Sequence, residues 1–585
     1  MNSSSDLIKL PDLSFDNLEE IMKERISETV TDKTVIPMLW QGLLEIKIPA
    51  GGIQRTAKLF VPKDTPQGTV FVLMNVPEGE ETVSFLQKSG WIAKAQECGF
   101  CLFVLEPGPG GWQEPDLEMP YIMAGFQAEI QGIYCLPAFS MYVAGYGAIG
   151  VCLHKAVMQD PLHVASAAFL DAGDVETSFL EEFSQKTYDR YHVACKDVPV
   201  PVLISARTLS PQAEAMAEYW RRAAHADLRE DDPEGTLFRQ NAPSPFTPEG
   251  NILKVRISRR AFPYADPDTT DRIWAFLSGY YRYGSGPCSN MLSQKADYRR
   301  LGVDRRAFTD RNGYRREYLV YIPESVRGGE KKLPVVVAIH GASQSMRNMF
   351  ENGLWYRIAE REGFMLVVPE CTFEPLPDWL NGGLAHAWRP LWGLIEPDST
   401  RHHQDAEYFD EMLDRVLSEY PADPARIYCT GHSMGCMMTN YLGSSFVSRR
   451  FAALGAMCGN LWAREYTGTG NMPVFLTMGE FDLWDYDVTA DTKVTEALDM
   501  WLIRNGLAGE SDVRAKRKSG ASQAYQEGRR HHYVWSDDAG TPWVRYAWIE
   551  KRDHMNSPEE NEMFWKEWFS RWKIGENGIR QYMEP

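Results

Sequence analysis

Residues 431–435 read Gly-His-Ser-Met-Gly, a Gly-x-Ser-x-Gly pattern that can present a serine hydroxyl as a nucleophile. The apolar stretch 425–430 predicts a short strand before this pattern, and 437–442 predict the beginning of a helix after it. In a sharp strand-to-helix turn, the two glycines let the backbone pass closely enough to expose the serine. The pattern therefore predicts Ser433 as the nucleophile of an acyl-transfer reaction.

A serine hydroxyl is a weak nucleophile until a base removes its proton and a carboxylate orients that base. Where the serine lies on such a turn, the acid follows it along the chain and the histidine comes last. Residues 474–478 predict a strand, and a glycine-led loop with several carboxylates follows it. In this loop we predict Asp482 as the acid, with Asp485 and Glu480 as lesser candidates.

The base is expected after the last strand of the chain. Residues 543–549 predict that strand, and the loop behind it carries His554, the only histidine that follows His532. A single loop histidine is usually a solvated side chain, but this one stands in the order that the chemistry requires. The sequence therefore predicts His554 as the base that acts with Ser433 and Asp482.

The oxyanion formed during acyl transfer needs backbone N–H donors that are already in place. We predict the N–H of Met434, which follows the nucleophile, as one donor. The other donor should follow the predicted strand 335–339, which runs into the His-Gly-Ala-Ser turn 340–343. In this turn Ala342 is the expected donor, and His340 is interpreted as structural.

The elements that position these residues occur twice in the chain. Residues 91–106 align without a gap with 355–370, and both segments read as an amphipathic helix, a Gly-Phe pair and an apolar strand. The further matches, in the same order, are 142–147 with 428–433, 200–204 with 471–476, and 273–284 with 564–575. Alternating strands and helices predict two tandem α/β domains, each a mostly parallel sheet flanked by helices.

The first copy lacks the chemistry of the second. Gly147 aligns with the serine, Ser210 aligns with the aspartate, and Pro263 stands where the histidine would be. We therefore expect a catalytically inactive N-terminal domain that packs on the catalytic one. The expected boundaries are 1–35 for an N-terminal arm, 36–290 for the inactive domain and 300–585 for the catalytic domain.

The second half resembles a known family. The resemblance covers about residues 305–575 and rests on 318–323 leading into 333–342, the helix 405–416, and the Tyr-Pro-Ala-Asp-Pro-Ala-Arg-Ile-Tyr lead-in 420–428. These motifs resemble the polyhydroxybutyrate-depolymerase-like and feruloyl-esterase-like esterases, of the carbohydrate esterase family one type, within the α/β hydrolases. The resemblance implies hydrolysis of carboxylic esters.

Two insertions are expected to shape the substrate site. The first, 373–404, carries Trp379, Trp388 and Trp392, which either stack on an aromatic acyl group or pack the loop onto the core. We group His432 with them as a substrate-binding residue. The second insertion, 509–542, is polar and charged and is interpreted as a flexible excursion or a lid.

The composition is that of an ordinary globular protein, with 44% hydrophobic and 24% charged residues in 585. A net charge of −19 argues against nucleic acid or an anionic membrane as a partner. No signal peptide or apolar run of 18 residues is visible, and the 10 cysteines are scattered, which favours free thiols and a cytoplasmic location. The adjacent histidines 402–403 and 531–532 lack acidic partners at ligand spacing, so we expect no metal and no other cofactor.

These observations predict a serine esterase that acts on a small or oligomeric ester with an aromatic or short-chain acyl group. A serine peptidase or amidase would use the same triad, and fold analogy does not separate the two. A non-catalytic scaffold of two hydrolase folds is the remaining alternative. The sequence leaves the acyl group, the alcohol and the oligomeric state open.

Overall fold

In the computed structural model the described residues form two compact units: unit 1 has residues 7–9 together with those between 37 and 295, and unit 2 has those from 296 onward. Of the expected arm, only Leu7–Lys9 is described, and it forms strand β1, which pairs in parallel with β2 (Gly42–Ala50). Within the described residues, no helix has the length and apolar character needed to span a bilayer. The described residues are 7–9, 42–50, 53–62, 70–127, 140–188, 193–205, 210–244, 247, 250, 252–260, 262–283, 291–342, 344–375, 384–391, 401–461, 468 and 470–584.

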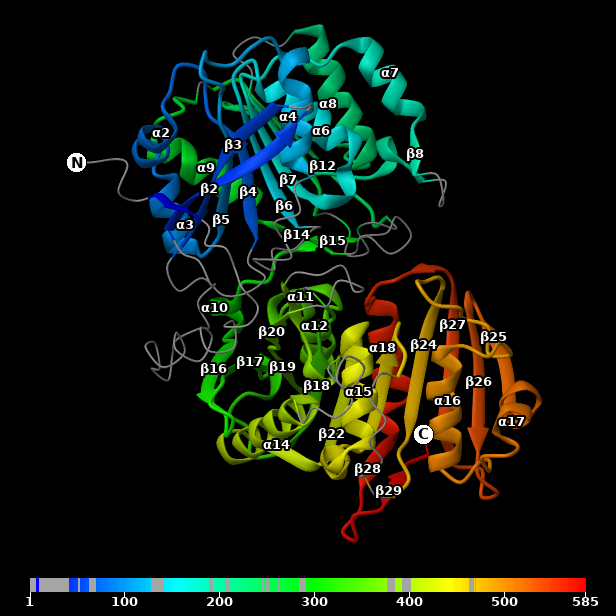
Figure 1. The fold of residues 1–585 in the computed structure, drawn as a ribbon. Helices are drawn as coiled ribbons and strands as arrows, with labels where there is room; N and C mark the ends of the chain where they lie inside the picture. Colours follow the sequence, from blue (N-terminus) through cyan, green and yellow to red (C-terminus); the bar gives the residue numbers. More distant parts are fainter. Residues whose placement is uncertain are drawn as a thin grey trace. The chain divides into compact units, whose positions relative to one another are not determined.

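In the described part of unit 2, ten strands form one sheet in the order β16-β17-β19-β18-β22-β23-β24-β27-β26-β25 (Figure 1). Its six strands from β19 to β27 run parallel, and antiparallel strands close both edges. The strands are β16 (Asp304–Thr309), β17 (Arg315–Tyr321), β18 (Leu333–Ile339), β19 (Met365–Pro369), β22 (Ala422–His432), β23 (Ala453–Met457), β24 (Val474–Phe481), β25 (Gln523–Glu527), β26 (Arg530–Ser536) and β27 (Pro542–Asp553).

Helices pack along this sheet and bury its central strands. Every residue of β18 and β19 is buried, as expected for apolar parallel strands that are covered on both faces. The helices are α10 (Tyr298–Leu301), α11 (Met346–Asn352), α12 (Trp355–Glu362), α14 (Arg401–Glu419), α15 (Met434–Ser444), α16 (Lys493–Arg504), α17 (Val513–Ser519) and α18 (Pro558–Glu567). The strands predicted at 335–339, 425–430, 474–478 and 543–549 are confirmed as parts of β18, β22, β24 and β27.

Unit 1 has a sheet of the same plan. In its described part the order is β1-β2-β3-β5-β4-β6-β7-β10-β13-β12-β11, and from β2 onward each strand has a counterpart in unit 2 with the same direction. Its strands after β2 are β3 (Ile53–Val61), β4 (Phe71–Asn75), β5 (Cys101–Leu105), β6 (Met141–Tyr146), β7 (Val164–Leu170), β10 (Val202–Ser205), β11 (Leu228–Asp232), β12 (Gly235–Arg239) and β13 (Lys254–Ser258). Its longer helices are α2 (Thr82–Lys88), α3 (Trp91–Cys98), α4 (Pro115–Phe126), α6 (Gly150–Gln159), α7 (Thr177–Gln185), α8 (Pro211–Ala223) and α9 (Pro267–Leu277).

Each unit also contains a similar hydrogen bond, which starts at aligned tyrosines and ends at carbonyls that lie one position apart in the alignment. In unit 1 the hydroxyl of Tyr142 donates to the backbone carbonyl of Tyr280 at 2.6 Å. In unit 2 the hydroxyl of the aligned Tyr428 donates to the carbonyl of Trp572 at 2.8 Å. Both tyrosines lie on the middle strand that leads to the strand-to-helix turn. The chain is thus an α/β protein whose two sheets follow one topology.

The polar insertion 509–542 is part of the unit 2 sheet, so its interpretation as a flexible excursion or a lid is wrong. It forms helix α17 and the edge strands β25 and β26, and β26 pairs with β27 along its length. The His-His-Tyr-Val-Trp run 531–535 contains aromatic and β-branched residues that favour a strand. Its charged neighbours lie on the exposed edge, where polar side chains keep a strand soluble.

Candidate active site

Ser433 lies at the turn between β22 and α15, with φ 56° and ψ −119°. Few residues other than glycine adopt a positive φ, and the neighbours of this serine hold it there. A Cβ on Gly431 would lie 2.2 Å from the carbonyl oxygen of Gly435, and a Cβ on Gly435 would lie 2.2 Å from that of Ile339. Both glycines of the motif are therefore required by close backbone contacts, which is why the turn can form.

Replacing Gly435 with alanine is expected to destabilise the fold by about 2–4 kcal/mol, because the new methyl group meets two backbone carbonyls that cannot move independently. Urea denaturation of the wild type and the variant measures the difference. Gly110→Ala is the control, since a Cβ there has no atom within 4 Å. Its expected change is within about 0.5 kcal/mol. Equal losses in the two variants would contradict the close contact at the turn.

The structure brings Ser433, His554 and Asp482 together from the ends of three parallel strands. Nε2 of His554 lies 2.8 Å from Oγ of Ser433, and Nδ1 lies 2.9 Å from Oδ1 of Asp482. Asp482 follows β24 and its side chain is fully buried, whereas His554 follows β27 and is 20% exposed. One side of the imidazole thus faces the hydroxyl and the other faces the carboxylate, which is the arrangement that a serine nucleophile needs.

The Asp482 carboxylate is held in its charged form. Burial alone would raise its pKa, but the hydrogen bond and charge of His554, with smaller contributions from Cys458 and Arg552, lower the pKa below its usual value. The lesser candidates lie elsewhere. Glu480 accepts a hydrogen bond from the backbone of Lys551, and Asp485 is exposed and accepts one from Asp487 within its own loop. Of the three carboxylates, the structure places Asp482 against His554.

Of the expected oxyanion donors, Met434 follows the nucleophile directly, and Ala342 follows a glycine that contacts it. Met434 is the first residue of α15, so its N–H has no acceptor within the helix. A Cβ on Gly341 would lie 3.1 Å from Cβ of Ser433, which places this turn against the nucleophile. Ala342 follows in the turn and is exposed. Two backbone N–H groups at such positions can bind a negative oxygen on the carbon that Ser433 attacks.

The side chain of His340 packs against this turn and contacts its backbone. It is fully buried, its Nδ1 lies 2.8 Å from the carbonyl of Gly341, and its Nε2 lies 2.9 Å from Oε1 of Glu370. Burial lowers the pKa of His340 to about 4. The indole N–H of Trp388 donates to the His340 carbonyl at 2.8 Å. These contacts agree with a structural role for His340.

Of the three tryptophans expected at the substrate site, the structure describes only Trp388. Trp388 is fully buried, and its ring packs against His340 and Phe409. Core packing therefore accounts for Trp388, and its expected stacking on a substrate is wrong because no face of the indole is open. Trp379 and Trp392 lie outside the described residues.

His432 lies beside the triad rather than on an open surface. It is 2% exposed, and its ring centroid is 4.8 Å from that of His554. Neither of its ring nitrogens makes a hydrogen bond of standard geometry with a described residue. Burial, together with the nearby His554, lowers the pKa of His432 well below its usual range, so the ring is neutral. Its position supports contact with His554, and its burial excludes contact with a substrate in this conformation.

Trp484 is a residue of the site that the sequence did not predict. Trp484 lies two residues after Asp482, and its ring meets that of His554 edge-on, with centroids 5.2 Å apart. It is partly exposed, and its neighbour Leu483 is 71% exposed, the highest value among the large exposed hydrophobic side chains. The signal was an apolar Leu-Trp pair in an otherwise acidic loop directly after the candidate acid. Trp484 thus gives His554 an apolar, partly exposed neighbour, and Leu483 beside it in the chain exposes its side chain to solvent.

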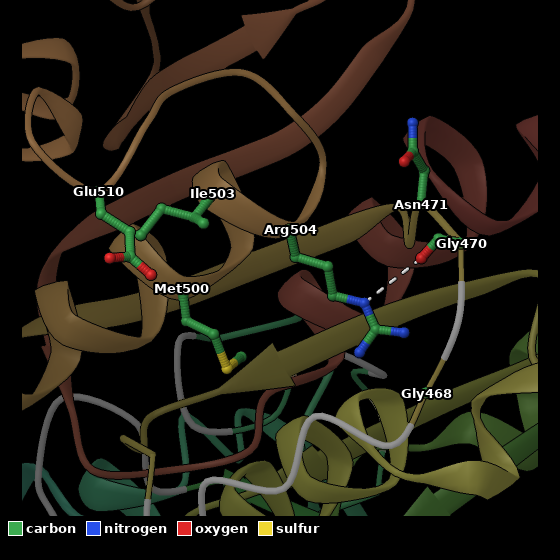
Figure 2. Close-up of a pocket in the computed structure, with 7 residues that line it drawn as sticks. All are labelled: Gly468, Gly470, Asn471, Met500, Ile503, Arg504 and Glu510. Atoms are coloured by element: carbon green, nitrogen blue, oxygen red, sulfur yellow. Dashed lines mark hydrogen bonds between the residues drawn. The ribbon is translucent and has the colours of Figure 1, made fainter.

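A pocket of about 620 Å³ lies away from these residues (Figure 2). Met500, Ile503 and Arg504 of α16 line it together with Gly470, whose carbonyl accepts a hydrogen bond from Arg504 at 3.4 Å. Gly470 precedes β24, whereas Asp482 follows that strand. The pocket and the triad therefore lie at opposite ends of β24.

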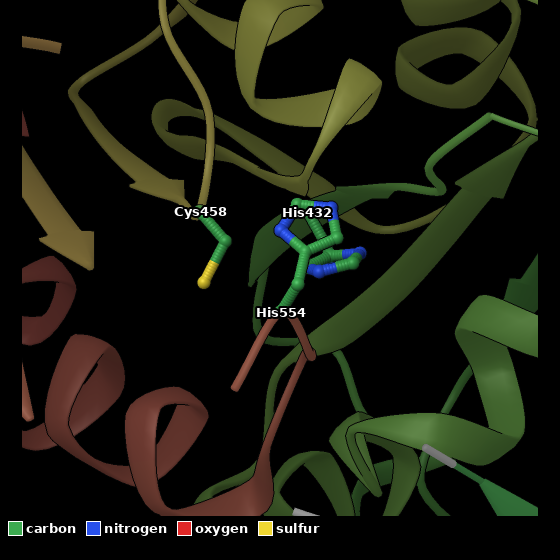
Figure 3. Close-up of side chains that lie close together, drawn as sticks. All are labelled: His432, Cys458 and His554. Atoms are coloured by element: carbon green, nitrogen blue, oxygen red, sulfur yellow. The ribbon is translucent and has the colours of Figure 1, made fainter. Parts of the chain in front are cut away.

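Two groups of side chains in the described residues have metal-ligand chemistry, and neither contains the histidine pairs 402–403 or 531–532. They are His432 with Cys458 and His554 (Figure 3), and His340 with Glu370 and Cys371. Of the pairs, His531 contacts Glu550 and stacks on Trp548, while His532 is buried beside Arg545.

The corresponding turn of unit 1 carries a glycine. Gly147 stands between β6 and α6 with φ 61°, and its N–H donates to the carbonyl of Leu170 at 3.0 Å. In unit 2 the N–H of Ser433 donates to Met457 at 2.9 Å. The two turns share a positive φ and this hydrogen bond, but Gly147 offers no hydroxyl. Ser210, aligned with the acid, begins helix α8 and donates to Asp174 at 2.6 Å.

The known proteins that this chain resembles in sequence include several esterases. No family model matches the chain. It is 21% identical over 262 residues to the bifunctional acetylxylan esterase/xylanase XynS20E of Neocallimastix patriciarum, covering 45% of this chain and 34% of that protein. It is 29% identical over 129 residues to feruloyl esterase B of Thermothelomyces thermophilus, covering 22% of this chain and 38% of that protein. The chain is similar to acetylxylan and feruloyl esterases.

The resemblance to esterases of the carbohydrate esterase family one type is thereby confirmed. The chain spans about a third of the length of the curated relatives it matches. Among solved structures, the acetyl xylan esterase from Aspergillus awamori is 15% identical with a TM-score of 0.32, covering 46% of this chain and 99% of that one. A TM-score this low bears on neither the fold nor the function.

Proposed function

We propose that this chain is a serine ester hydrolase whose active site lies in unit 2. The observation that carries the proposal is the contact of His554 with both Ser433, at 2.8 Å, and the buried Asp482, at 2.9 Å. The similarity to acetylxylan and feruloyl esterases supports an ester as the substrate. The reaction needs no cofactor, because the nucleophile, the base and the oxyanion donors all come from the chain.

The proposed reaction transfers an acyl group in two steps. Nε2 of His554 takes the proton of Ser433 as Oγ attacks the ester carbonyl, and the N–H groups of Met434 and Ala342 stabilise the oxyanion. His554 then gives this proton to the leaving alcohol, and an acyl-enzyme remains. In the second step His554 takes a proton from water, which attacks the acyl carbon, and returns the proton to Ser433. Asp482 keeps Nδ1 of His554 protonated throughout.

Hydrolysis of four compounds tests the proposal and its alternatives: p-nitrophenyl acetate, p-nitrophenyl butyrate, methyl ferulate and an aminoacyl anilide. We expect cleavage of the esters and none of the anilide. Cleavage of the anilide alone would replace the esterase by an amidase. No cleavage of any of the four would contradict a general esterase.

We propose that Trp484 contacts the acyl or alcohol group, because its partly exposed ring lies edge-on to His554, and that the exposed Leu483 next to it in the chain adds apolar surface. In Trp484→Ala we expect kcat/KM for methyl ferulate to fall about two- to tenfold relative to p-nitrophenyl acetate, the value of one aromatic contact. Leu228→Ala, at an exposed leucine of unit 1, is the control and should leave the ratio unchanged. An equal loss on both esters in Trp484→Ala would place the tryptophan in support of His554 instead.

We propose further that unit 1 does not hydrolyse esters. What supports this is the glycine at position 147, in a turn that shares a positive φ and a backbone hydrogen bond with that of Ser433. A second active site elsewhere in unit 1 would survive a change at Ser433. The full chain with Ser433→Ala therefore tests both units in one assay.

A further inference from the structure

Three side chains that commonly bind metals converge beside the nucleophile (Figure 3). His432 ends β22, Cys458 follows β23, and His554 follows β27, so each stands at the carboxyl end of a parallel strand. One ligand atom from each of the three lies within 4.8 Å of the other two. The ligand atoms around a tetrahedral Zn²⁺ are separated by about 3.5 Å, so a small closure of the side chains suffices.

The state of His432 is the observation that points to a ligand. It is 2% exposed, and neither ring nitrogen makes a hydrogen bond of standard geometry with a described residue; its one polar neighbour there is the backbone of His554. A buried polar group without a partner is rare in folded proteins, because its lost hydration is not replaced. An imidazole nitrogen that carries no proton offers a lone pair of the kind that a metal ion binds.

Cys458 and the surrounding charges complete the site. Cys458 is fully buried directly after β23, and its Sγ lies 3.8 Å from the carbonyl of Met555 and also contacts the Asp482 carboxylate. The Asp482 carboxylate lies against His554 and supplies negative charge beside the cluster. Arg552 lies nearby, but its guanidinium is paired with the buried Glu560. The site is therefore not dominated by positive charge.

We propose that His432, Cys458 and His554 bind a borderline-soft divalent cation of the Zn²⁺ type, and that the bound cation inhibits the enzyme. Two imidazoles and one thiolate are a ligand set that suits Zn²⁺ and Co²⁺. Both nitrogens of His554 are used by the triad, so the imidazole cannot bind a cation and serve Ser433 together. The inhibition rests on the proposed ester hydrolysis, whereas the binding does not.

The second group in the described residues shows why the first is preferred. His340, Glu370 and Cys371 also lie close together, but both ring nitrogens of His340 are already engaged. Nδ1 contacts the Gly341 carbonyl at 2.8 Å, and Nε2 contacts Glu370 at 2.9 Å and the N–H of Cys371 at 3.3 Å. A cation there would break contacts that hold the oxyanion turn, whereas a cation in the first group gains His432 as a ligand and breaks the triad contacts of His554, which is why it would inhibit.

Binding is tested first without any need for activity. Co²⁺ is added to the Ser433→Ala protein, which keeps all three ligands, and the near-ultraviolet band of cobalt bound to thiolate is recorded. We expect the band to saturate at one Co²⁺ per protein chain and to disappear when Zn²⁺ displaces the cobalt. In Ser433→Ala/Cys458→Ser the band should be absent. The matched control is Ser433→Ala/Cys98→Ser, because Cys98 is an exposed thiol of unit 1, and it should keep the band. A missing band, or the same band in both double variants, would overturn the site.

Inhibition is tested on the wild type with p-nitrophenyl acetate. We expect Zn²⁺ to inhibit and EDTA to restore the rate, and the apparent inhibition constant to rise about tenfold or more in Cys458→Ser, each protein being compared with its own uninhibited rate. Cys98→Ser should match the wild type. Equal inhibition constants in all three proteins would overturn the proposal.

If Cys458→Ser does not fold, His432→Gln in the Ser433→Ala background replaces it, and the cobalt band should again be lost.

Discussion

Changing Ser433 to alanine is expected to lower kcat for p-nitrophenyl acetate by about 10⁶-fold, to the background of the assay. The substitution removes only the Oγ atom that lies 2.8 Å from Nε2 of His554. Alanine keeps the Cβ, so it meets the same backbone strain at φ 56° as the serine does. Folding should therefore be intact, as judged by an unchanged circular dichroism spectrum and urea midpoint.

The control for this prediction is Ser519→Ala. Ser519 is exposed on α17, and its hydroxyl bonds only to the carbonyl of Ala515 in its own helix. The rate should stay at the wild-type value in this variant. Ester hydrolysis near the wild-type rate in Ser433→Ala would refute the nucleophile. If Ser433→Ala kept a few per cent of the wild-type rate after further purification, this would indicate a second active site in unit 1.

Changing Asp482 to asparagine is expected to lower kcat by about 10⁴-fold. Asparagine has almost the same size, so the buried site is filled, but its amide carries no charge. It no longer stabilises the imidazolium that forms when His554 takes the proton of Ser433. It also no longer fixes the ring with Nδ1 protonated, so Nε2 is less often free to accept that proton. Steady-state kinetics should show the loss in kcat, with little change in KM.

Asp485→Asn and Glu480→Gln are the controls, because these two carboxylates were the other candidates for the acid. Neither contacts His554, so both variants should stay within about twofold of the wild type. If one of them lost activity as Asp482→Asn is expected to do, the acid would be assigned wrongly.

Asp482 also predicts a pH dependence of stability. Its pKa is lowered on folding from the usual 3.8, so its ionised form stabilises the native state at pH values above 3.8. That contribution is lost as the pH falls through the lower native pKa. The difference in urea midpoint between wild type and Asp482→Asn should therefore shrink below about pH 4. A difference that is constant from pH 7 to pH 3 would contradict the lowered pKa.

The sequence predicted correctly those features that depend mainly on residues close together in the chain. The Gly-x-Ser-x-Gly motif identified the turn, because its two glycines meet backbone atoms that any such turn brings close. Apolar strands such as β18 were predicted because a parallel strand covered on both faces has to be apolar throughout. The edge strands β25 and β26 were missed because the edge of a sheet carries charged side chains, which resemble those of a loop.

By itself, the sequence determined the order of nucleophile, acid and base, and it narrowed the base to His554. Only the tertiary structure decided which carboxylate faces that histidine, because Glu480, Asp482 and Asp485 stand within six residues of one another and the chain alone does not show that Glu480 lies on β24 while Asp482 is buried against His554. It also showed that Trp388 is buried, since burial depends on elements far away in the chain. The meeting of His432 with Cys458 and His554 was likewise invisible, because the ends of parallel strands come together only when the sheet has formed.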